Sequence, residues 1–151
     1  MDGVRISRAT RDDLPALLAL LAAVNLPHEG VEEYLDGFML ARETKGRLVG
    51  CIGLERHGGV GLLRSAAVAH DARGTGLGLR LTSELLEAAR AEGVGEVVLL
   101  TTTARDFFGR KFGFEVSGRD AYEVALARSP EWNLPRCSSA VLMRLHLGGV
   151  S

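Results

Sequence analysis

The residues with the clearest chemical potential form a short glycine-rich segment, Arg73-Gly74-Thr75-Gly76-Leu77-Gly78. It lies between an apolar run, Leu62 to Val68, that predicts a strand, and Leu79 to Glu92, whose spacing predicts an amphipathic helix. Glycine adopts left-handed conformations without steric penalty, so three glycines at alternate positions predict a tight turn with accessible amides. Because the first N–H groups of a helix lack partners and its dipole is positive there, we expect a phosphate or pyrophosphate to bind.

The glycine spacing excludes two common phosphate-binding loops. A dinucleotide-binding loop requires G-x-G-x-x-G, but the third glycine position after Gly74 and Gly76 is Leu79, and the sequence has no Gly-Lys-Ser/Thr ending of a P-loop. The remaining pattern is R-x-x-G-x-G, filled by Arg73, Gly76 and Gly78. The alternative is a plain turn between a strand and a helix, but such a turn usually needs one glycine rather than three.

Length and composition predict a single globular domain over residues 1–151. Hydrophobic residues make up 46% of the chain and charged residues 25%, and the formal net charge is -1. Because there is no basic block, we expect no nucleic-acid partner. The apolar run Leu17 to Val24 is shorter than a membrane span of about 20 residues, and the N-terminus has no signal-peptide pattern. We therefore expect a cytoplasmic protein without a membrane partner.

The cysteines and histidines predict neither a disulfide nor a metal site. Cys51 and Cys137 are far apart in the sequence, so we interpret both as reduced thiols. Cys51 is expected to be a small buried apolar residue, and Cys137 a packed or partly exposed cysteine rather than a metalloid-binding thiol. The four histidines, which show no ligand spacing, are His28, His57, His70 and His146.

The elements that must position the glycine segment follow from hydrophobic periodicity. Four leucines at helical spacing from Leu14 to Leu21 predict a first helix, with Asp12 as its N-cap. Further helices are predicted at 31–36, 79–92, 105–112 and 120–128, and strands at 4–9, 38–43, 47–55, 62–68, 97–100, 114–117 and 141–147. Short turns make the early strands antiparallel, whereas the strand–helix–strand unit around the glycine segment is parallel. The prediction is an α/β fold with a mixed sheet of about six to seven strands flanked by helices.

This order of elements, with the glycine segment after the fourth strand, resembles the GNAT N-acetyltransferase superfamily. A second match is the aromatic pair Phe107-Phe108 followed by Gly113-Phe114, at the position where the family has a short helix and then a Gly-Phe. The stretch Leu99 to Ala104, together with Cys137 to Ala140, is similar to amino-acid N-acetyltransferases of the N-acetylglutamate synthase type. The chain most closely resembles a subgroup linked to arsenic-resistance operons.

The resemblance implies direct attack of a neutral amine on the thioester of acetyl-CoA, which lies between two splayed parallel strands. By position, the backbone amide of Val68 would polarise the thioester carbonyl. Phe107, Phe108 and Thr101 would contact the cofactor from the other strand and the short helix. The remaining cofactor-binding positions, for pantetheine and then for pyrophosphate, would be Ala66, Ala67 and Val68, followed by Arg73, Gly74, Thr75, Gly76, Leu77, Gly78 and Leu79.

The chain departs from the family at Phe108, where many members have a tyrosine that protonates the leaving thiolate. Phenylalanine has no proton to donate, so a water or another side chain does this work or the thiolate leaves unprotonated. General acid catalysis typically supplies about 10²–10⁴-fold, and positioning can supply more. A plain packing role for Phe107 and Phe108 is the preferred interpretation.

Two charged residues are candidates for handling the acceptor. Glu55, at the end of the strand beside the cofactor strand, is the candidate base, with Glu43 as a weaker alternative; the competing interpretation of Glu55 is a solvated strand-end carboxylate. Arg64 lies inside an otherwise apolar strand and could bind a substrate carboxylate. Its alternative is an outward-facing position on the sheet.

The predicted function is acetylation of a small amine, an amino acid or an amino-acid-like toxin. Two alternatives stay open, namely a non-catalytic acyl-CoA sensor and an enzyme that acetylates protein N-termini or lysines. The near-neutral charge gives no preference for a basic peptide. A homodimer is a further possibility, because exposed terminal strands often pair.

Overall fold

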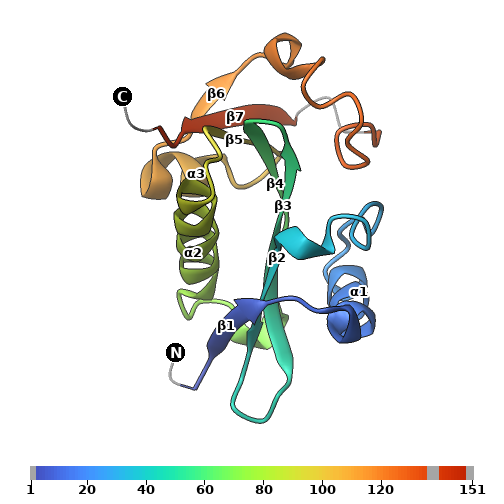
Figure 1. Cartoon of the computed structure of the whole chain (residues 1–151). Coiled ribbons are helices and arrows are strands. Elements are labelled where there is room, and N and C mark those ends of the chain that lie inside the picture. Colours follow the sequence, from blue (N-terminus) through green and yellow to red (C-terminus); the bar gives the residue numbers. More distant parts are fainter. Residues whose placement is uncertain (1–2, 136–139, 149–151) are drawn as a thin grey trace. The chain divides into compact units, whose positions relative to one another are not determined.

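The computed structural model in Figure 1 describes residues 3–135 and 140–148. Its three α-helices in these residues are α1 (Leu14–Ala23), α2 (Leu77–Ala91) and α3 (Arg105–Phe112). The strands are β1 (Arg5–Arg8), β2 (Phe38–Arg42), β3 (Leu48–His57), β4 (Val60–Val68), β5 (Glu96–Thr101), β6 (Glu115–Ser117) and β7 (Val141–His146). Cys137, for which we predicted a packed or partly exposed thiol, lies outside the described residues.

The seven strands form one mixed sheet in the order β1-β2-β3-β4-β5-β7-β6. β1, β2 and β3 pair antiparallel, and β4 pairs with β5 in parallel, with Val60–Leu62 opposite Glu96–Val98. β7 lies between β5 and β6 and runs antiparallel to both, as Figure 1 shows. The predicted mixed sheet, with its parallel pair at the crossover through α2, is thereby confirmed.

By the density of their contacts, the residues group into two compact units. The first holds residues 1–54 and 65–87, and therefore contains the glycine loop, which we define as Arg73–Gly78. The second holds residues 55–64 and 88–151, and contains Glu55 and Arg64. The division crosses β3 and β4, so the glycine loop and the predicted acceptor residues, Glu55 and Arg64, belong to different units.

In the first unit, α1 buries its leucine face against the early strands. Leu17 and Leu21 are fully buried in a cluster with Phe38, Leu40 and Cys51, so Cys51 is the buried apolar residue that we predicted. The predicted N-cap, Asp12, is wrong by one residue. Asp13 directly precedes α1, and its carboxylate also accepts a 2.7 Å hydrogen bond from the Thr10 amide in a capping box for the preceding 3₁₀ turn.

Two glycines of β3 allow neighbouring groups of the first unit to pack closely against this strand. A Cβ at Gly50 would lie 2.9 Å from Leu81 Cδ1, so the missing side chain lets α2 approach β3. A Cβ at Gly53 would lie 2.4 Å from the Phe38 ring, which occupies that space. Since α2 starts at the end of the glycine loop, this close approach also fixes where the loop lies relative to β3.

Two predicted helices are absent from the described residues. The segment 31–36 consists of turns that lead into a 3₁₀ helix, Leu35–Gly37, and 120–128 consists of a 3₁₀ helix, Arg119–Tyr122, followed by turns. Both segments bury apolar side chains at a spacing that also suits a helix. Short helices gain little stability from their own hydrogen bonds. Turns can therefore bury the same apolar side chains without forming a helix.

The second unit has a separate core beneath its part of the sheet. Leu62 of β4, Val98 of β5 and Leu142 of β7 pack with Tyr122 and Leu126 of the turn segment between β6 and β7. Leu126 is fully buried, and its amide bonds to the Tyr122 carbonyl at 3.0 Å. The turn segment is therefore anchored to the sheet despite its lack of regular structure.

Candidate active site

Residues 73–76 of the glycine loop are exposed, and the loop enters α2 through two left-handed residues. Gly74 and Gly76 have φ angles of +81° and +82°, which side-chain-bearing residues adopt only under strain. The Gly76 carbonyl accepts the Arg80 amide at 3.1 Å, so α2 winds directly from the loop. The first-turn amides of α2 have no preceding turn to bond, which leaves them available to an anion beside the loop.

Side chains of the loop turn back onto its own backbone. Arg73 Nε donates to the Val68 carbonyl at 3.3 Å, and Thr75 Oγ1 donates to the Ala72 carbonyl at 2.7 Å. Just before the loop, Arg47 of the β2–β3 turn bonds Asp71 at 2.7 Å and holds the pKa of that carboxyl below its ordinary value of 3.8. These bonds hold the shape of the loop.

The strand before the loop is irregular where the cofactor contacts were predicted. Ser65, inside β4, has a φ of +57°, a conformation that is strained for serine and interrupts the regular strand. Its carbonyl accepts a 3.2 Å contact from the Cys51 thiol. Beyond it, Ala66 is exposed, Ala67 buried and Val68 half-buried. The end of β4 thus offers backbone and small side chains at the surface next to the loop.

The two predicted acceptor residues, Glu55 and Arg64, are bonded to each other in the second unit. Arg64 Nη1 donates to Glu55 Oε2 at 2.8 Å, and both side chains are 0% exposed. The alternatives of a solvated carboxylate at Glu55 and an outward-facing Arg64 are therefore wrong. Both alternatives assumed that an unpaired charge must stay in solvent. Here each charged side chain is buried together with the other as its ion-pair partner.

Three further side chains, which our sequence analysis did not identify, complete this group. Ser129 Oγ donates to Glu55 Oε1 at 2.5 Å, and His57 Nε2 lies 3.0 Å from the same oxygen. A second carboxylate, Glu131, lies 3.4 Å from Arg64 Nε. We call the five residues the carboxylate cluster. The only sequence signal was a shared strand face for Glu55 and His57, because residues two apart point the same way.

The predicted residues after β5 have mainly structural contacts in the second unit. Thr101 Oγ1 accepts the Ala104 amide at 2.9 Å and so shapes the turn into α3. Phe108 is buried and packs edge-on against Phe107 and Phe114, with ring centres 5.1 and 5.5 Å apart. These contacts support the preferred packing role of the aromatic pair.

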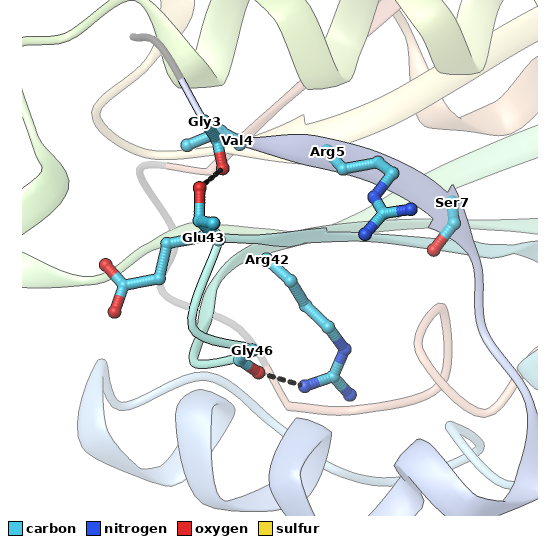
Figure 2. A pocket seen from close by; sticks show the side chains of 8 residues that line it. Gly3, Val4, Arg5, Ser7, Arg42, Glu43 and Gly46 are labelled. Carbon is cyan, nitrogen blue, oxygen red and sulfur yellow. Dashed lines mark hydrogen bonds between the residues drawn. The ribbon is translucent and has the colours of Figure 1, made fainter.

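The weaker base candidate, Glu43, lies in a different place. It pairs with Arg47 at 3.3 Å and lines a surface hollow of about 600 Å³ in the first unit. Figure 2 shows Arg42, another lining residue, donating to the Gly46 carbonyl, at 2.8 Å. The lining includes no residue of the glycine loop, so the hollow does not bring Glu43 to the predicted donor site.

Within residues 3–135 and 140–148, no group of three or more metal-ligating side chains is found. Over the same residues, none of the helices has the length and apolar character needed to cross a membrane.

Comparison with known proteins identifies relatives of this sequence. An amino-acid acetyltransferase of Neisseria meningitidis serogroup A is 27% identical over 150 residues, which cover 93% of this chain and 34% of the relative. The chain therefore spans about one third of the length of the curated relatives that it matches.

Solved structures share the fold. N-acetylglutamate synthase from Neisseria gonorrhoeae, complexed with coenzyme A and N-acetyl-glutamate, has a TM-score of 0.75 at 21% identity over 97% of this chain and 35% of its own. A protein from Mycobacterium tuberculosis, complexed with CoA, has a TM-score of 0.77 at 22% identity over 94% of this chain and 98% of its own. The acetyltransferase (GNAT) family model matches residues 11–114, more than half of the sequence, and the chain therefore belongs to this family.

Proposed function

We propose that this chain transfers the acetyl group of acetyl-CoA directly to the amine of a small molecule that carries a carboxylate, such as an amino acid. The observation that carries the proposal is the exposed glycine loop at the start of α2, which follows an irregular β4 after one short 3₁₀ helix. Family membership and the relatives named amino-acid acetyltransferase support it.

In this proposal, the donor is held mainly by backbone. The amides of Arg73 to Leu79 bind the pyrophosphate, because the helix start and the two left-handed glycines present N–H groups to an anion. Ala66, Ala67 and Val68 pair with the pantetheine arm, and the Val68 amide polarises the thioester carbonyl. Thr101, Phe107 and Phe108 remain proposed donor-contacting residues because of the family resemblance of the positions that they occupy.

The reaction forms one bond and breaks one. The amine nitrogen attacks the thioester carbon, the C–S bond breaks, CoA leaves as a thiolate, and the amine loses a proton. We propose Glu55 as the final acceptor of that proton, through a water, because its carboxylate is fully buried and cannot meet the amine directly. Phe108 offers no proton for the thiolate, so solvent supplies it.

Arg64 is the proposed partner of the acceptor carboxylate. Its guanidinium carries five N–H donors in a fork that suits carboxylates, and in the structure it already donates to the carboxylate of Glu55. An acceptor that brings its own carboxylate fits a site whose cation already binds that group. This argument favours free amino acids over the amines of protein lysines.

The experiment is thiol release from acetyl-CoA across the common amino acids, their amides and simple amines. We expect turnover with one or more amino acids, and a Glu55→Gln variant that is at least about 100-fold slower in kcat, as for loss of a general base. Glu43→Gln is the matched control and should behave as the parent. Turnover confined to amines without a carboxylate would contradict the proposed acceptor class.

The second candidate is a non-catalytic acyl-CoA sensor, favoured by the buried phenylalanine at position 108. Tight CoA binding by calorimetry, together with no thiol release on any amine, would select it.

A further inference from the structure

The surface hollow that Glu43 lines contains two arginines that lie directly opposite each other. Its lining residues come from β1, from β2 and from the segments that flank these strands, all within the first unit. Arg5 of β1 is the register partner of Arg42 of β2, so both side chains leave the sheet on the same face. Like charges directly opposite each other on neighbouring strands are destabilising. The fold therefore places two mutually repelling cations on the lining of one hollow.

The two guanidiniums differ in what they bind. Arg42 Nη2 lies 2.5 Å from Asp13 Oδ1, and Arg42 Nη1 donates to the Gly46 carbonyl at 2.8 Å. Arg42 therefore has a counter-ion and a fixed position, and it keeps further N–H donors, since a guanidinium carries five. Arg5 is exposed, and its side chain makes neither a hydrogen bond nor an ion pair within the part of the chain that the structure describes. Arg5 is the cation of this hollow whose charge is not compensated.

The carboxylate on the lining does not compensate Arg5. Figure 2 shows the Glu43 side chain pointing away from Arg5 and Arg42, and its carboxylate lies 3.3 Å from Arg47 Nε. Ser7 also lines the hollow, and it shares the face of β1 that carries Arg5 because it lies two residues further along the strand. The shared face thus offers two cations and a hydroxyl to a ligand.

Hydrogen bonds across the rim fix the shape of the hollow. Thr44 Oγ1 donates to the Gly3 carbonyl at 3.0 Å and so joins the β2–β3 turn to the segment before β1. The bond from Arg42 to the Gly46 carbonyl fastens the other side of the same turn. The volume of about 600 Å³ falls within the range of about 300–1,000 Å³ that is usual for small-molecule sites. The hollow is thus large enough for a small organic molecule.

We propose that this hollow, which we call the arginine hollow, binds a small organic anion between Arg5 and Arg42. A carboxylate or a phosphate placed there accepts charge-assisted hydrogen bonds from both guanidiniums and offsets their repulsion. The planar fork of arginine suits either oxyanion. The lining contains no residue of the glycine loop and neither Glu55 nor Arg64. The arginine hollow is therefore an accessory site, distinct from the positions proposed for the acetyl donor and acceptor.

Arg5→Gln removes the uncompensated cation. We expect affinity for the anion to fall about tenfold or more, because hydrogen bonds to a charged group are lost. The urea unfolding midpoint should stay equal or rise, because the repulsion with Arg42 is relieved. Arg8→Gln is the matched control. It removes the same charge from the same strand, but Arg8 does not line the hollow and, three residues after Arg5, it faces the other side of β1.

The experiment uses three probes of similar size, namely phenyl phosphate, phenylacetate and the uncharged phenylacetamide. Each is titrated into the ¹⁵N-labelled parent, Arg5→Gln and Arg8→Gln, with and without saturating CoA. Backbone amide signals of Arg42, Thr44 and Gly46 report on the arginine hollow, and those of the glycine loop report on the donor site. We expect saturable shifts at the hollow with at least one of the two anions and none with the amide, at equal affinity with and without CoA.

The two variants decide whether the binding is specific. Affinity about tenfold weaker in Arg5→Gln and unchanged in Arg8→Gln supports the proposal, and the anion that binds identifies the oxyanion that the site accepts. Absence of shifts at the hollow with both anions, equal binding of the amide, or equal losses in the two variants would overturn it. Displacement of the probe by CoA would also overturn it, because the hollow would then belong to the donor site. Thiol release is not part of this readout, so failure of the proposed acetyl transfer leaves the result unaffected.

Discussion

The glycine loop lies open at the surface and presents backbone, whereas the carboxylate cluster is buried and works through side chains. In the loop, Arg73 to Gly76 are exposed, and a Cβ added at Gly74 or Gly76 would meet no atom within 4 Å. In the cluster, Glu55 and Arg64 are fully buried and each depends on the other for its charge.

Because of this difference, the two regions should tolerate amino-acid substitutions differently. In the loop, a substitution is limited by backbone conformation and by what binds there, because there is space for a side chain. In the cluster, a substitution leaves a buried charge without its partner, so the fold itself is affected. Donor binding can then be altered without loss of the fold, while changes at the proposed acceptor site cost stability.

The largest effect is expected for Arg64→Met, which leaves the Glu55 carboxylate buried without its cation. Removing one partner of a buried pair typically costs about 3–5 kcal/mol of unfolding free energy. Urea unfolding monitored by Trp132 fluorescence measures the loss.

Arg47→Met is the matched control for this variant. Arg47 also bridges two carboxylates, Glu43 and Asp71, but at the surface, where solvent replaces the lost bonds. We expect a much smaller loss than for Arg64→Met. Equal losses for the two variants would remove the distinction between buried and open charge on which the comparison depends.

The loop was predictable from sequence because its signal is local. Arg73, Gly76 and Gly78 lie within six residues, and the flanking strand and helix show their own periodicity. The bounds of α3, Arg105–Phe112, follow in the same way from local sequence, with Gly113 in a left-handed conformation directly after it.

The carboxylate cluster was only half predictable. Glu55 and Arg64 stood out as charges in or beside apolar strands, but their mutual bond depends on the strand register. Ser129 lies 74 residues from Glu55, and nothing in the local sequence at Ser129-Pro130 indicates that its hydroxyl reaches a buried carboxylate. The wrong helix prediction for 120–128 also concealed the turn that carries Glu131, since periodicity does not separate short helices from buried turns.

The next largest effect is expected for Gly76→Ala in the loop. Alanine at a φ of +82° is strained by about 1–2 kcal/mol, although no atom collides with its Cβ. Urea unfolding gives the loss in stability. Gly59→Ala is the control, because that glycine has neither a positive φ nor a close neighbour. A Gly76→Ala protein as stable as the parent would show that the loop relaxes freely.

Gly78→Ala separates folding from donor binding. Gly78 lies in the first turn of α2 with an ordinary φ, and its nearest neighbour for a Cβ is Val68 Cγ2 at 4.0 Å. We therefore expect stability equal to or slightly above that of the parent, since alanine favours a helix. The Cβ would crowd a bound pyrophosphate, and CoA affinity measured by calorimetry should fall about fivefold. Unchanged affinity would place the pyrophosphate elsewhere.

The smallest effect is expected for the ion pair of Asp13 and Arg42. Its exposure to solvent is less than that of the glycine loop and greater than that of the buried carboxylate cluster. The pair is 2.5 Å apart, with side chains 19% and 31% exposed. The Thr10 amide, with a contribution from Arg42, holds the pKa of Asp13 below its ordinary value of 3.8. A carboxyl with a lowered folded pKa stabilises the fold above its unfolded pKa and loses that contribution as the pH falls through the folded value.

For Asp13→Asn we expect a loss of about 0.2–1 kcal/mol at pH 7, because solvent screens the pair. The difference between parent and variant should shrink as the pH falls below 3.8, where the parent carboxylate also becomes protonated. Urea unfolding of both proteins at pH 7 and at several values below 4 tests this. A difference that widens on acidification would mean that the neutral carboxyl is the stabilising form, opposite to the direction that the Thr10 and Arg42 bonds require.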